Sequence, residues 1–391
     1  MRDAERLANV AEIVTSTYRR GHDVLVVVSA QGDTTDDLIE KAAQLNPNPS
    51  KREMDVLLSA GEQISASLLA MTIEGLGFPV VSLLGWQAGY TTSSNYGDAR
   101  IKRVDTSRVK KELDKKNIVI ITGFQGINRY GDVTTLGRGG SDTSAVAMAA
   151  AIHAELCQIY TDVDGVYTAD PRKVPGAKKL DSISYDEMLE LATLGAQVLH
   201  NRSVEMAKKY NIELEVCSSL EKVSGTIVKE DGTMEKMMIS GVAKDVEVAR
   251  ISIIGVPDKP GLAFKFFSKL AANHINVDII LQSIGRNGTK DISFTVVKSK
   301  MEETVGLLDG YAQRLGANCV VADENVAKVS IVGAGMETHP GVAAEMFEAL
   351  YSKNINIQMI STSEIKISVL LDKRDADNAV LVIHDKFFGE A

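Results

Sequence analysis

One sequence unit occurs twice in the C-terminal part of the chain. Pro260–Gly261 recurs as Pro340–Gly341, and at the same offset Ile275–Ile280 recurs as Ile355–Ile360. A common offset means that the two units share their internal spacing, which is the mark of a structural repeat. Each unit reads as strand, helix opened by Pro-Gly, strand, strand, helix and strand. This part of the chain is therefore restricted to two copies of one small α+β (βαββαβ) domain.

The second copy is one strand short. The first copy has room for all six elements, and its last strand falls at 319–322, whereas the second ends at Ala391 after its second helix. An unassigned strand lies at 237–243, just before the first copy. We expect this strand to complete the sheet of the second copy (326–391), so that the first copy (248–322) is an insertion. The alternative is that residues 237–243 form a loose linker strand.

Residues 1–230 alternate between apolar runs and helical patterns. Val24–Ser29 is a continuous apolar run, which is typical of a strand buried on both faces. Further strand candidates lie at 80–84, 118–122, 157–161 and 212–216, and helical patterns lie at 3–19, 51–75, 106–115, 142–154 and 184–209. This alternation predicts an α/β domain with a mostly parallel sheet sandwiched by helices. A polar loop at 30–35 follows the first strand, at the edge where such sheets bind ligands.

The composition excludes several classes of partner. A net charge of -9 argues against a nucleic-acid or anionic-membrane surface. The chain has no apolar run of about 18 residues, so we expect no membrane span. Its three cysteines are far apart and form no CxxC pair, and its histidines are scattered, so we expect no disulfide framework and no metal site. These features favour a cytoplasmic protein.

A glycine-rich loop precedes the helical pattern that begins at residue 142. Two glycines flank Arg138, and Ser141 occupies the position expected for a helix N-cap. Backbone N–H groups, a helix N-terminus and a guanidinium together suit an anion, and the planar fork of arginine matches a carboxylate. We therefore predict that Arg138 binds a substrate carboxylate, although it could be an ordinary surface arginine. Ser141 could cap the helix, bind substrate or do both.

Three motifs occur in a fixed order ahead of the repeats. They are Ser59-Ala60-Gly61-Glu62, Gly137-Arg138-Gly139-Gly140-Ser141-Asp142 and the stretch from Thr161 to Arg172. With the two repeats, which are similar to tandem ACT domains, this set resembles the aspartate kinases of the amino acid kinase superfamily over nearly the whole chain. The resemblance implies transfer of the γ-phosphoryl group of ATP, with Mg²⁺, to the β-carboxylate of L-aspartate. The product would be 4-phospho-L-aspartate, the first intermediate of lysine, threonine and methionine biosynthesis.

The resemblance also implies roles for individual residues. Ser29, Glu62, Arg138 and Ser141 would bind aspartate, with Glu62 accepting the α-ammonium group; Asp142 would act with Arg138 near the transferred phosphoryl group or its metal; Thr161, Asp162, Tyr167 and Arg172 would contact the nucleotide. A carboxylate nucleophile is already ionised at neutral pH, so the reaction needs no general base. Catalysis then rests on positioning and charge stabilisation. The plainer interpretations are a solvated helix glutamate for Glu62, a helix-dipole acid for Asp142 and an Asp-Gly turn for residues 162–165.

The chain departs from the family pattern at two places. Gln197 stands where some relatives have a nucleotide-binding lysine. The family opens with a strand and Lys-Phe-Gly-Gly-Thr-Ser, which hold the ATP phosphates, whereas Met1 falls where the following helix should begin. Either the recorded start is late or the protein lacks this segment. Loss of a central strand would expose apolar surface and sheet edges, so we favour the late start.

The repeats contain no catalytic cluster, and the resemblance implies that they pair in a homo-oligomer and bind an amino acid effector, lysine or threonine or both. The matching effector positions are Asp258, Gly261, Asn276, Asp278 and Gln282 in the first repeat and Asn356, Thr362 and Glu364 in the second. Turn chemistry alone would also explain the Asp-Lys-Pro-Gly stretch. Two other functions stay open: a non-catalytic amino-acid-sensing subunit, and a kinase for glutamate or a nucleotide. The glutamate alternative is disfavoured by the tandem repeats and by the Glu62 and Arg138 motifs.

Overall fold

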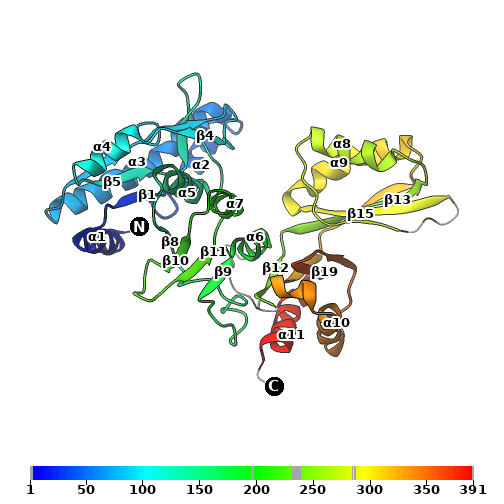
Figure 1. Ribbon diagram of the computed structural model, residues 1–391. Helices are drawn as coiled ribbons and strands as arrows, with labels where there is room; N and C mark the ends of the chain where they lie inside the picture. The colour runs from blue at the N-terminus through cyan, green and yellow to red at the C-terminus, as the bar shows by residue number, and fades with distance from the viewer. Residues whose placement is uncertain (1–2, 195–197, 231–238, 284, 286–287, 390–391) are drawn as a thin grey trace. The chain divides into compact units, whose positions relative to one another are not determined.

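The computed structural model describes residues 3–389 except 195–197, 231–238, 284 and 286–287 (Figure 1). The chain divides into two compact units. Unit 1 comprises Met1–Val166, Leu180–Ala192 and Gln197–Gly232, and unit 2 comprises Tyr167–Lys179, Thr193–Ala196 and Thr233–Ala391. Residues 167–179 fall inside the predicted domain 1–230 but pack with the C-terminal part of the chain.

A parallel sheet with helices on both faces forms the core of unit 1, as predicted. Its strand order is β1 (Leu25–Val28), β5 (Ile118–Thr122) and β2 (Val80–Leu83). Helices α1 (Ala4–Arg19) and α3 (Lys51–Gly75) cover one face, and α4 (Ser107–Asp114) and α5 (Gly140–Ile152) cover the other. Successive side chains of β5 point to opposite faces, so Ile118 and Ile120 join one core cluster and Val119 and Ile121 the other.

Strand β1 is less buried than its apolar sequence predicts. Only Val28 is buried, and the three residues before it are half-buried. The reason is that β1 pairs with β5 alone among the described strands, in the register Leu25↔Val119 to Val28↔Thr122. A strand that pairs on one side keeps one edge accessible.

A second, mixed sheet of unit 1 has the strand order β8-β10-β11-β9. Its strands are β8 (Cys157–Thr161), β10 (Leu214–Ser218), β11 (Thr226–Lys229) and β9 (Ser182–Ser184), and its helices are α6 (Tyr185–Thr193) and α7 (Asn201–Tyr210). The prediction of one helix over 184–209 is wrong, because residues 194 and 198–200 are not helical. His200 has extended backbone (φ -82°, ψ 135°) and acts as the N-cap of a new helix.

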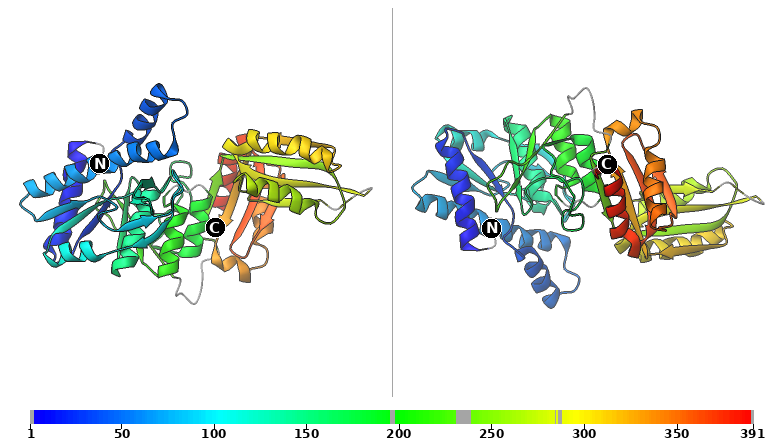
Figure 2. Two further views of the ribbon diagram at one scale, coloured as in Figure 1. Left: turned by 90° about the horizontal axis from the view of Figure 1, so that it is seen from above. Right: turned by 90° about the horizontal axis from the view of Figure 1, so that it is seen from below.

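Several short elements of unit 1 were not predicted. A third sheet has the order β4-β3-β6-β7, formed by Ile101–Val104, Tyr90–Thr92, Gln125–Ile127 and Val133–Thr135. Helix α2 (Thr34–Leu45) begins within the predicted loop at 30–35 and contains no buried residue. Figure 2 shows α2 projecting from the rest of unit 1. Strands of three or four residues and a helix without a buried face leave no sustained hydrophobic period in the sequence.

Unit 2 contains the two repeats as two antiparallel sheets, each with two helices. The first repeat consists of β13 (Val248–Pro257), α8 (Leu262–Ala272), β14 (Ile280–Gln282), β15 (Thr289–Val297), α9 (Met301–Arg314) and β16 (Cys319–Asp323). The second consists of β17 (Val326–Val332), α10 (Val342–Ser352), β18 (Met359–Thr362), β19 (Lys366–Asp372) and α11 (Ala376–Phe388). The sheet orders β14-β15-β13-β16 and β18-β19-β17-β12 are equivalent, so the fold repeats as the sequence does.

Strand β12 (Gly241–Asp245) occupies in the second sheet the place of β16 in the first. It pairs antiparallel with β17, from Gly241↔Val332 to Asp245↔Lys328. Part of the strand predicted at 237–243 falls on residues 231–238, which lie outside the described residues. On its other side, the Val242 N–H donates to the Thr168 carbonyl at 2.7 Å. Ala169 and Val174 are buried in the core of the second repeat, which explains why residues 167–179 belong to unit 2.

The paired Pro-Gly turns give a direct test of the repeat. Gly261 and Gly341 have φ +88° and +108° at the N-caps of α8 and α10, with open space where a Cβ would lie. Alanine at either position should lower the free energy of unfolding by about 1–2 kcal/mol through backbone strain alone. The control is Gly306→Ala within α9, also in open space, which should raise it by about 0.5–1 kcal/mol. Urea denaturation of the full chain measures all three, and equal effects would contradict the assigned turn geometry.

Candidate active site

A cavity of about 270 Å³ lies in unit 1, beyond the carboxyl end of β1 and at the N-terminus of α5. It is lined by Ser29, Ala30, Gly32, Thr35, Glu62, Phe124 and residues 137–142. The structure thus brings together five residues that the sequence singled out for the substrate and the phosphoryl group: Ser29, Glu62, Arg138, Ser141 and Asp142. They converge because strand ends and helix N-termini meet at one edge of a parallel sheet.

Glu62 is the most constrained side chain of the cavity. It is only 4% exposed, and its Oε1 accepts a hydrogen bond from the Ala30 N–H at 3.0 Å. Its Oε2 is buried without a hydrogen-bond partner in the described part of the chain. Burial raises the pKa of Glu62 to about 7, against the stabilising bond from Ala30. A buried, unpaired carboxylate oxygen in a cavity wall is a site for a cation or a hydrogen-bond donor.

The preceding glycine explains how Glu62 reaches the loop after β1. A Cβ added at Gly61 would lie 2.8 Å from the Cβ of Ala30. Only glycine therefore allows Ala30 to approach α3 closely enough to bond Glu62. The Ser-Ala-Gly-Glu motif thus has a packing reason for its glycine and an electrostatic consequence for its glutamate.

The glycine loop (Gly137–Gly140) leads into α5, which begins two residues earlier than predicted. Gly139, with φ +67°, is the N-cap and Gly140 is the first helical residue. The prediction of Ser141 as the N-cap is therefore wrong, because the left-handed conformation of Gly139 starts the helix before Ser141 is reached. Ser141 lies in the first turn against Gly123, whose added Cβ would be 2.8 Å from the Ser141 Oγ.

Arg138 is exposed and has no hydrogen bond or ion pair with any described residue. It lies between Gly137 (φ +77°) and Gly139 (φ +67°), so the backbone on both sides adopts the left-handed region. A guanidinium in a cavity wall with no internal anion suits a carboxylate or phosphate ligand. The cavity therefore combines a free cation with an unpaired anion.

Asp142 lies in the first helical turn of α5, where the helix dipole favours an acid. Burial raises the pKa of Asp142 to about 6, and a hydrogen bond from the His200 backbone N–H opposes this shift. The His200 ring also covers Gly139, where an added Cβ would lie 2.2 Å from the His200 Cγ. The start of α7 therefore packs against the glycine loop.

Sequence analysis did not predict some residues at and around the site. Phe124 lines the cavity with φ +65°, and its N–H donates to the Ser144 Oγ at 3.1 Å. Arg202 donates to the Leu136 carbonyl at 2.5 Å and to the Ala99 carbonyl at 3.0 Å. No local pattern marks either residue, because their partners are distant in the sequence or depend on a left-handed turn.

The predicted nucleotide residues are divided between the two units. Thr161 ends β8 and donates through Oγ1 to Oδ1 of the exposed Asp162 at 3.1 Å, both in unit 1. Tyr167 and Arg172 belong to unit 2, where Arg172 forms an ion pair with Asp170 at 3.0 Å. Gln197 lies outside the described residues. Each unit therefore contains two of the four residues.

The predicted effector residues occupy turns and strand ends of the repeats. In the first repeat, Asp258 pairs with Lys290 at 2.9 Å, and Asp278 pairs with the buried Lys328 of the second repeat. The remaining positions are in loops or at the ends of elements: Gly261 at the N-cap of α8, Gln282 at the end of β14, Thr362 at the end of β18, and Asn276, Asn356 and Glu364 at exposed loop positions. Nearly all of these side chains face solvent.

The described residues contain no cluster of three or more His, Cys, Asp or Glu that could hold a metal ion. Helix α3 is long and apolar enough to cross a membrane by composition. Its residues Leu69 and Ile73 are fully buried against the sheet, as in the core helix of a globular domain.

Comparison with known proteins identifies the family. The amino acid kinase family model matches residues 1–218, and the ACT domain model matches residues 251–310 and 329–387. The chain is 50% identical over 384 residues to the aspartokinase of Bacillus sp. (strain MGA3), covering 98% of this chain and 93% of that protein. The chain belongs to the aspartokinases of the amino acid kinase family. It is equally 50% identical over 393 residues to the aspartokinase of Corynebacterium efficiens, covering 99% of this chain and 93% of the relative.

Solved structures agree with this aspartokinase assignment. E. coli aspartokinase III in complex with aspartate and ADP, in the R-state, is 26% identical with a TM-score of 0.83, covering 99% of this chain and 97% of that chain. Aspartate kinase from Synechocystis is 41% identical with a TM-score of 0.55, covering 99% of this chain and 67% of that one. The expected family, fold class and type of enzyme are thus confirmed.

The raised pKa of Glu62 makes the stability of this aspartokinase depend on pH. Because the folded-state pKa is about 7 and the ordinary value is 4.5, the folded protein loses stability as pH rises through this range. Glu62→Gln should therefore raise the free energy of unfolding near pH 8 by about 3 kcal/mol, and the gain should shrink towards about pH 4. Urea denaturation at both pH values measures the difference.

The matched control is Glu74→Gln, at an exposed position of the same helix, where the burial penalty is absent. A gain from Glu62→Gln that is independent of pH, or equal to that of the control, would contradict the burial of an ionisable carboxyl at this site.

Proposed function

We propose that the chain transfers the γ-phosphoryl group of ATP to the β-carboxylate of L-aspartate, giving 4-phospho-L-aspartate. The observation that carries this proposal is that one cavity contains both a Glu62 oxygen and an Arg138 guanidinium that have no partner among the described residues. A zwitterionic dicarboxylate requires this arrangement of one anion and at least one cation. The similar E. coli aspartokinase III was crystallised with aspartate and ADP, which supports the same substrates here.

In the proposed complex, the α-ammonium group of aspartate donates to Glu62 Oε2. This bond relieves the burial cost of that oxygen and keeps Glu62 ionised. Arg138 and Ser141 hold the substrate carboxylates, and Ser29, which directly follows β1, lines the same cavity. Orientation of the β-carboxylate towards the phosphoryl group is then the main contribution of these side chains.

The attacking oxygen needs no general base, because a carboxylate is ionised at neutral pH. Asp142 fits a Mg²⁺ partner: it is a half-buried carboxylate that lines the cavity, and a nearby cation would lower its pKa of about 6. Mg²⁺ commonly uses one or two carboxylates with substrate phosphates, so a dedicated cage of protein ligands is not required. Bound there, the ion would neutralise charge on the phosphates. Arg138 would add to that neutralisation from the loop.

The nucleotide is proposed to contact Thr161, Asp162, Tyr167 and Arg172. The position of Thr161 at the carboxyl end of β8 supports this assignment, since such strand ends bind ligands in α/β sheets. Tyr167 and Arg172 are proposed as nucleotide contacts only because they belong to the motif from Thr161 to Arg172.

The ACT repeats are proposed to bind lysine, threonine or both, within a cytoplasmic homo-oligomer at the start of lysine, threonine and methionine biosynthesis. The E. coli aspartokinase III crystallised with lysine supports such an effector. The candidate ligands are Asp258, Gly261, Asn276, Asp278 and Gln282, and Asn356, Thr362 and Glu364. Calorimetric titration of the full chain with each amino acid tests this proposal, and silence for both would contradict it.

Hydroxamate trapping of the acyl phosphate tests the catalytic proposal. We expect hydroxamate that depends on both ATP and L-aspartate, and little when L-glutamate replaces aspartate. Arg138→Gln should raise the KM for aspartate by about 10- to 100-fold, because the substrate loses its carboxylate partner. The control is Arg129→Gln, at an exposed arginine that stacks on Tyr130, which should leave this KM unchanged.

The sensor alternative predicts a different result. A non-catalytic regulatory subunit would bind lysine or threonine but give no hydroxamate with either substrate. The match of the kinase part to the aspartokinases over nearly its whole length does not favour that alternative.

A further inference from the structure

Helix α3 has a second buried acid besides Glu62. Asp55 lies two turns earlier on the same face and is 1% exposed. Its carboxylate accepts four hydrogen bonds from three donors: the Gly97 N–H at 3.0 Å to both oxygens, the Thr135 N–H at 3.0 Å, and the Thr135 hydroxyl at 2.7 Å. Every oxygen of Asp55 is thus satisfied by neutral groups, whereas Glu62 keeps one oxygen unpaired.

The partners of Asp55 form the base of the glycine loop. Thr135 is the last residue of β7, and its carbonyl accepts from the Ala99 N–H at 2.9 Å. Gly97 lies under the loop itself, because an added Cβ at Gly137 would be 3.1 Å from the Gly97 carbonyl oxygen. Asp55 therefore holds both segments from which the loop rises.

The opposite side of the same base is held by Arg202 of α7. Its guanidinium donates to the carbonyls of Leu136 and Ala99, and the Leu136 N–H donates to the Phe124 carbonyl at 2.8 Å. The backbone polar groups from Thr135 to Leu136 are thus all bonded. Arg138 follows two residues later with no bond of its own among the described residues. The arrangement is a fixed base that carries a free guanidinium.

Holding a turn with a buried carboxylate costs free energy. Removing it from water disfavours its ionised form, and burial raises the pKa of Asp55 against the bonds from Thr135 and Gly97. An amide could not replace it, because the NH₂ group of asparagine would face donors instead of accepting from them. Both side-chain oxygens of residue 55 must therefore accept hydrogen bonds at the point where the glycine loop leaves β7.

We propose that Asp55 is a positioning residue for the kinase reaction: by holding Gly97 and Thr135, it keeps Arg138 where the substrate carboxylate binds. The inference rests on the proposed function, since it assigns the aspartate site to Arg138. It predicts that loss of Asp55 weakens the use of aspartate and leaves the use of ATP unchanged.

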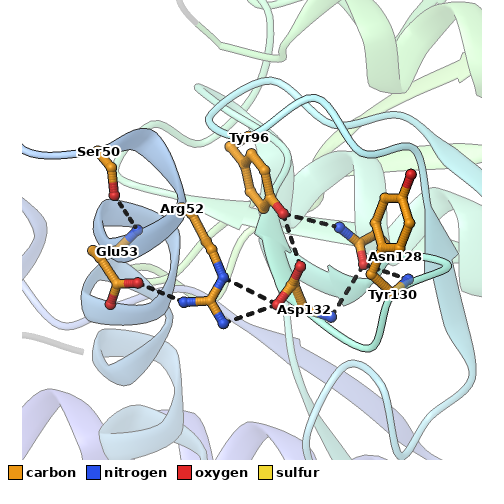
Figure 3. A network of polar contacts seen from close by, with 7 residues as sticks. All are labelled: Ser50, Arg52, Glu53, Tyr96, Asn128, Tyr130 and Asp132. Atoms are coloured by element: carbon orange, nitrogen blue, oxygen red, sulfur yellow. Dashed lines mark hydrogen bonds and ion pairs between the residues drawn. The ribbon is translucent and has the colours of Figure 1, made fainter.

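The chain provides a matched control on its surface. Figure 3 shows a second network between α3, the loop at 93–98 and the β6–β7 turn, centred on Asp132. Asp132 accepts from Arg52 at 2.9 and 3.0 Å and from the Tyr96 hydroxyl at 2.8 Å. Like Asp55, it joins α3 to the loop at 93–98, but through exposed or half-buried side chains, none of which lines the cavity, and from the β6–β7 turn instead of the end of β7.

The test compares Asp55→Asn with Asp132→Asn in the full chain, using steady-state kinetics for both substrates and thermal unfolding. Asp55→Asn should raise the KM for aspartate by about 10- to 100-fold, with the KM for ATP within about twofold of wild type. Asp132→Asn should leave both KM values unchanged. A lowered Tm for Asp55→Asn with an unchanged KM for aspartate would overturn the proposal, because a purely structural role moves only stability.

Thr135 provides the second variant, should Asp55→Asn not fold. Thr135→Val removes one donor to Asp55 at nearly constant shape and should raise the KM for aspartate, whereas Thr135→Ser keeps the hydroxyl and should restore it. Equal KM values in Thr135→Val and Thr135→Ser would overturn the proposal. Absence of aspartate-dependent hydroxamate in the wild-type protein would instead reject the proposed function, so the two failures are distinguishable.

Discussion

One stripe of helix α3 connects the core of unit 1 with its candidate site. Buried residues follow each other at alternating spacings of three and four: Asp55, Ser59, Glu62, Ala66, Leu69 and Ile73. The C-terminal half of this stripe is apolar and packs against β1 and β5, which fixes the helix on the sheet. The N-terminal half is polar and extends past the strand ends. Asp55 holds the base of the glycine loop there, and Glu62 reaches the cavity. The burial of three apolar side chains at one end therefore determines where two carboxylates lie at the other.

This arrangement places opposite electrostatic demands on neighbouring groups. Glu62 is buried with one oxygen unpaired, which raises its pKa to about 7 and makes the empty cavity less favourable at neutral pH. Arg138 has the converse condition: it is an exposed cation that forms no ion pair with the part of the chain that the structure describes. A substrate that carries an ammonium group and a carboxylate pairs with Glu62 and Arg138 at once. The site therefore lowers the stability of the free protein and in return favours this class of ligand. Arg138 lies exposed between Gly137 and Gly139, both of which adopt the left-handed backbone conformation that glycine favours.

Long, regular patterns in the sequence predicted the fold well. Short elements, and contacts between residues far apart in the sequence, were not predicted. Helices α1 and α3, strands β2, β5 and β8, and the two repeats were foreseen, because each has a sustained hydrophobic period or a repeated spacing. The strands of three or four residues in the third sheet, helix α2 and the break before α7 were not, because they leave no such period. Within the site, motifs singled out Glu62, Arg138, Ser141 and Asp142, which line one cavity. Ser141 is nevertheless not the N-cap, because the left-handed Gly139 starts the helix earlier and composition does not reveal its conformation. Asp55 and Arg202 act through partners far away in the sequence, so only the folded chain shows what they hold.

The central claim is that Glu62 and Arg138 together select a zwitterionic dicarboxylate. The most direct measurement is calorimetric binding of L-aspartate and of succinate, which lacks only the ammonium group, to the wild-type protein and to Glu62→Gln. The account predicts that wild type prefers aspartate by a factor equivalent to about 1.5–3 kcal/mol, the usual contribution of a charged hydrogen bond. It also predicts that Glu62→Gln binds the two ligands alike. An undiminished preference for aspartate in Glu62→Gln would contradict the account.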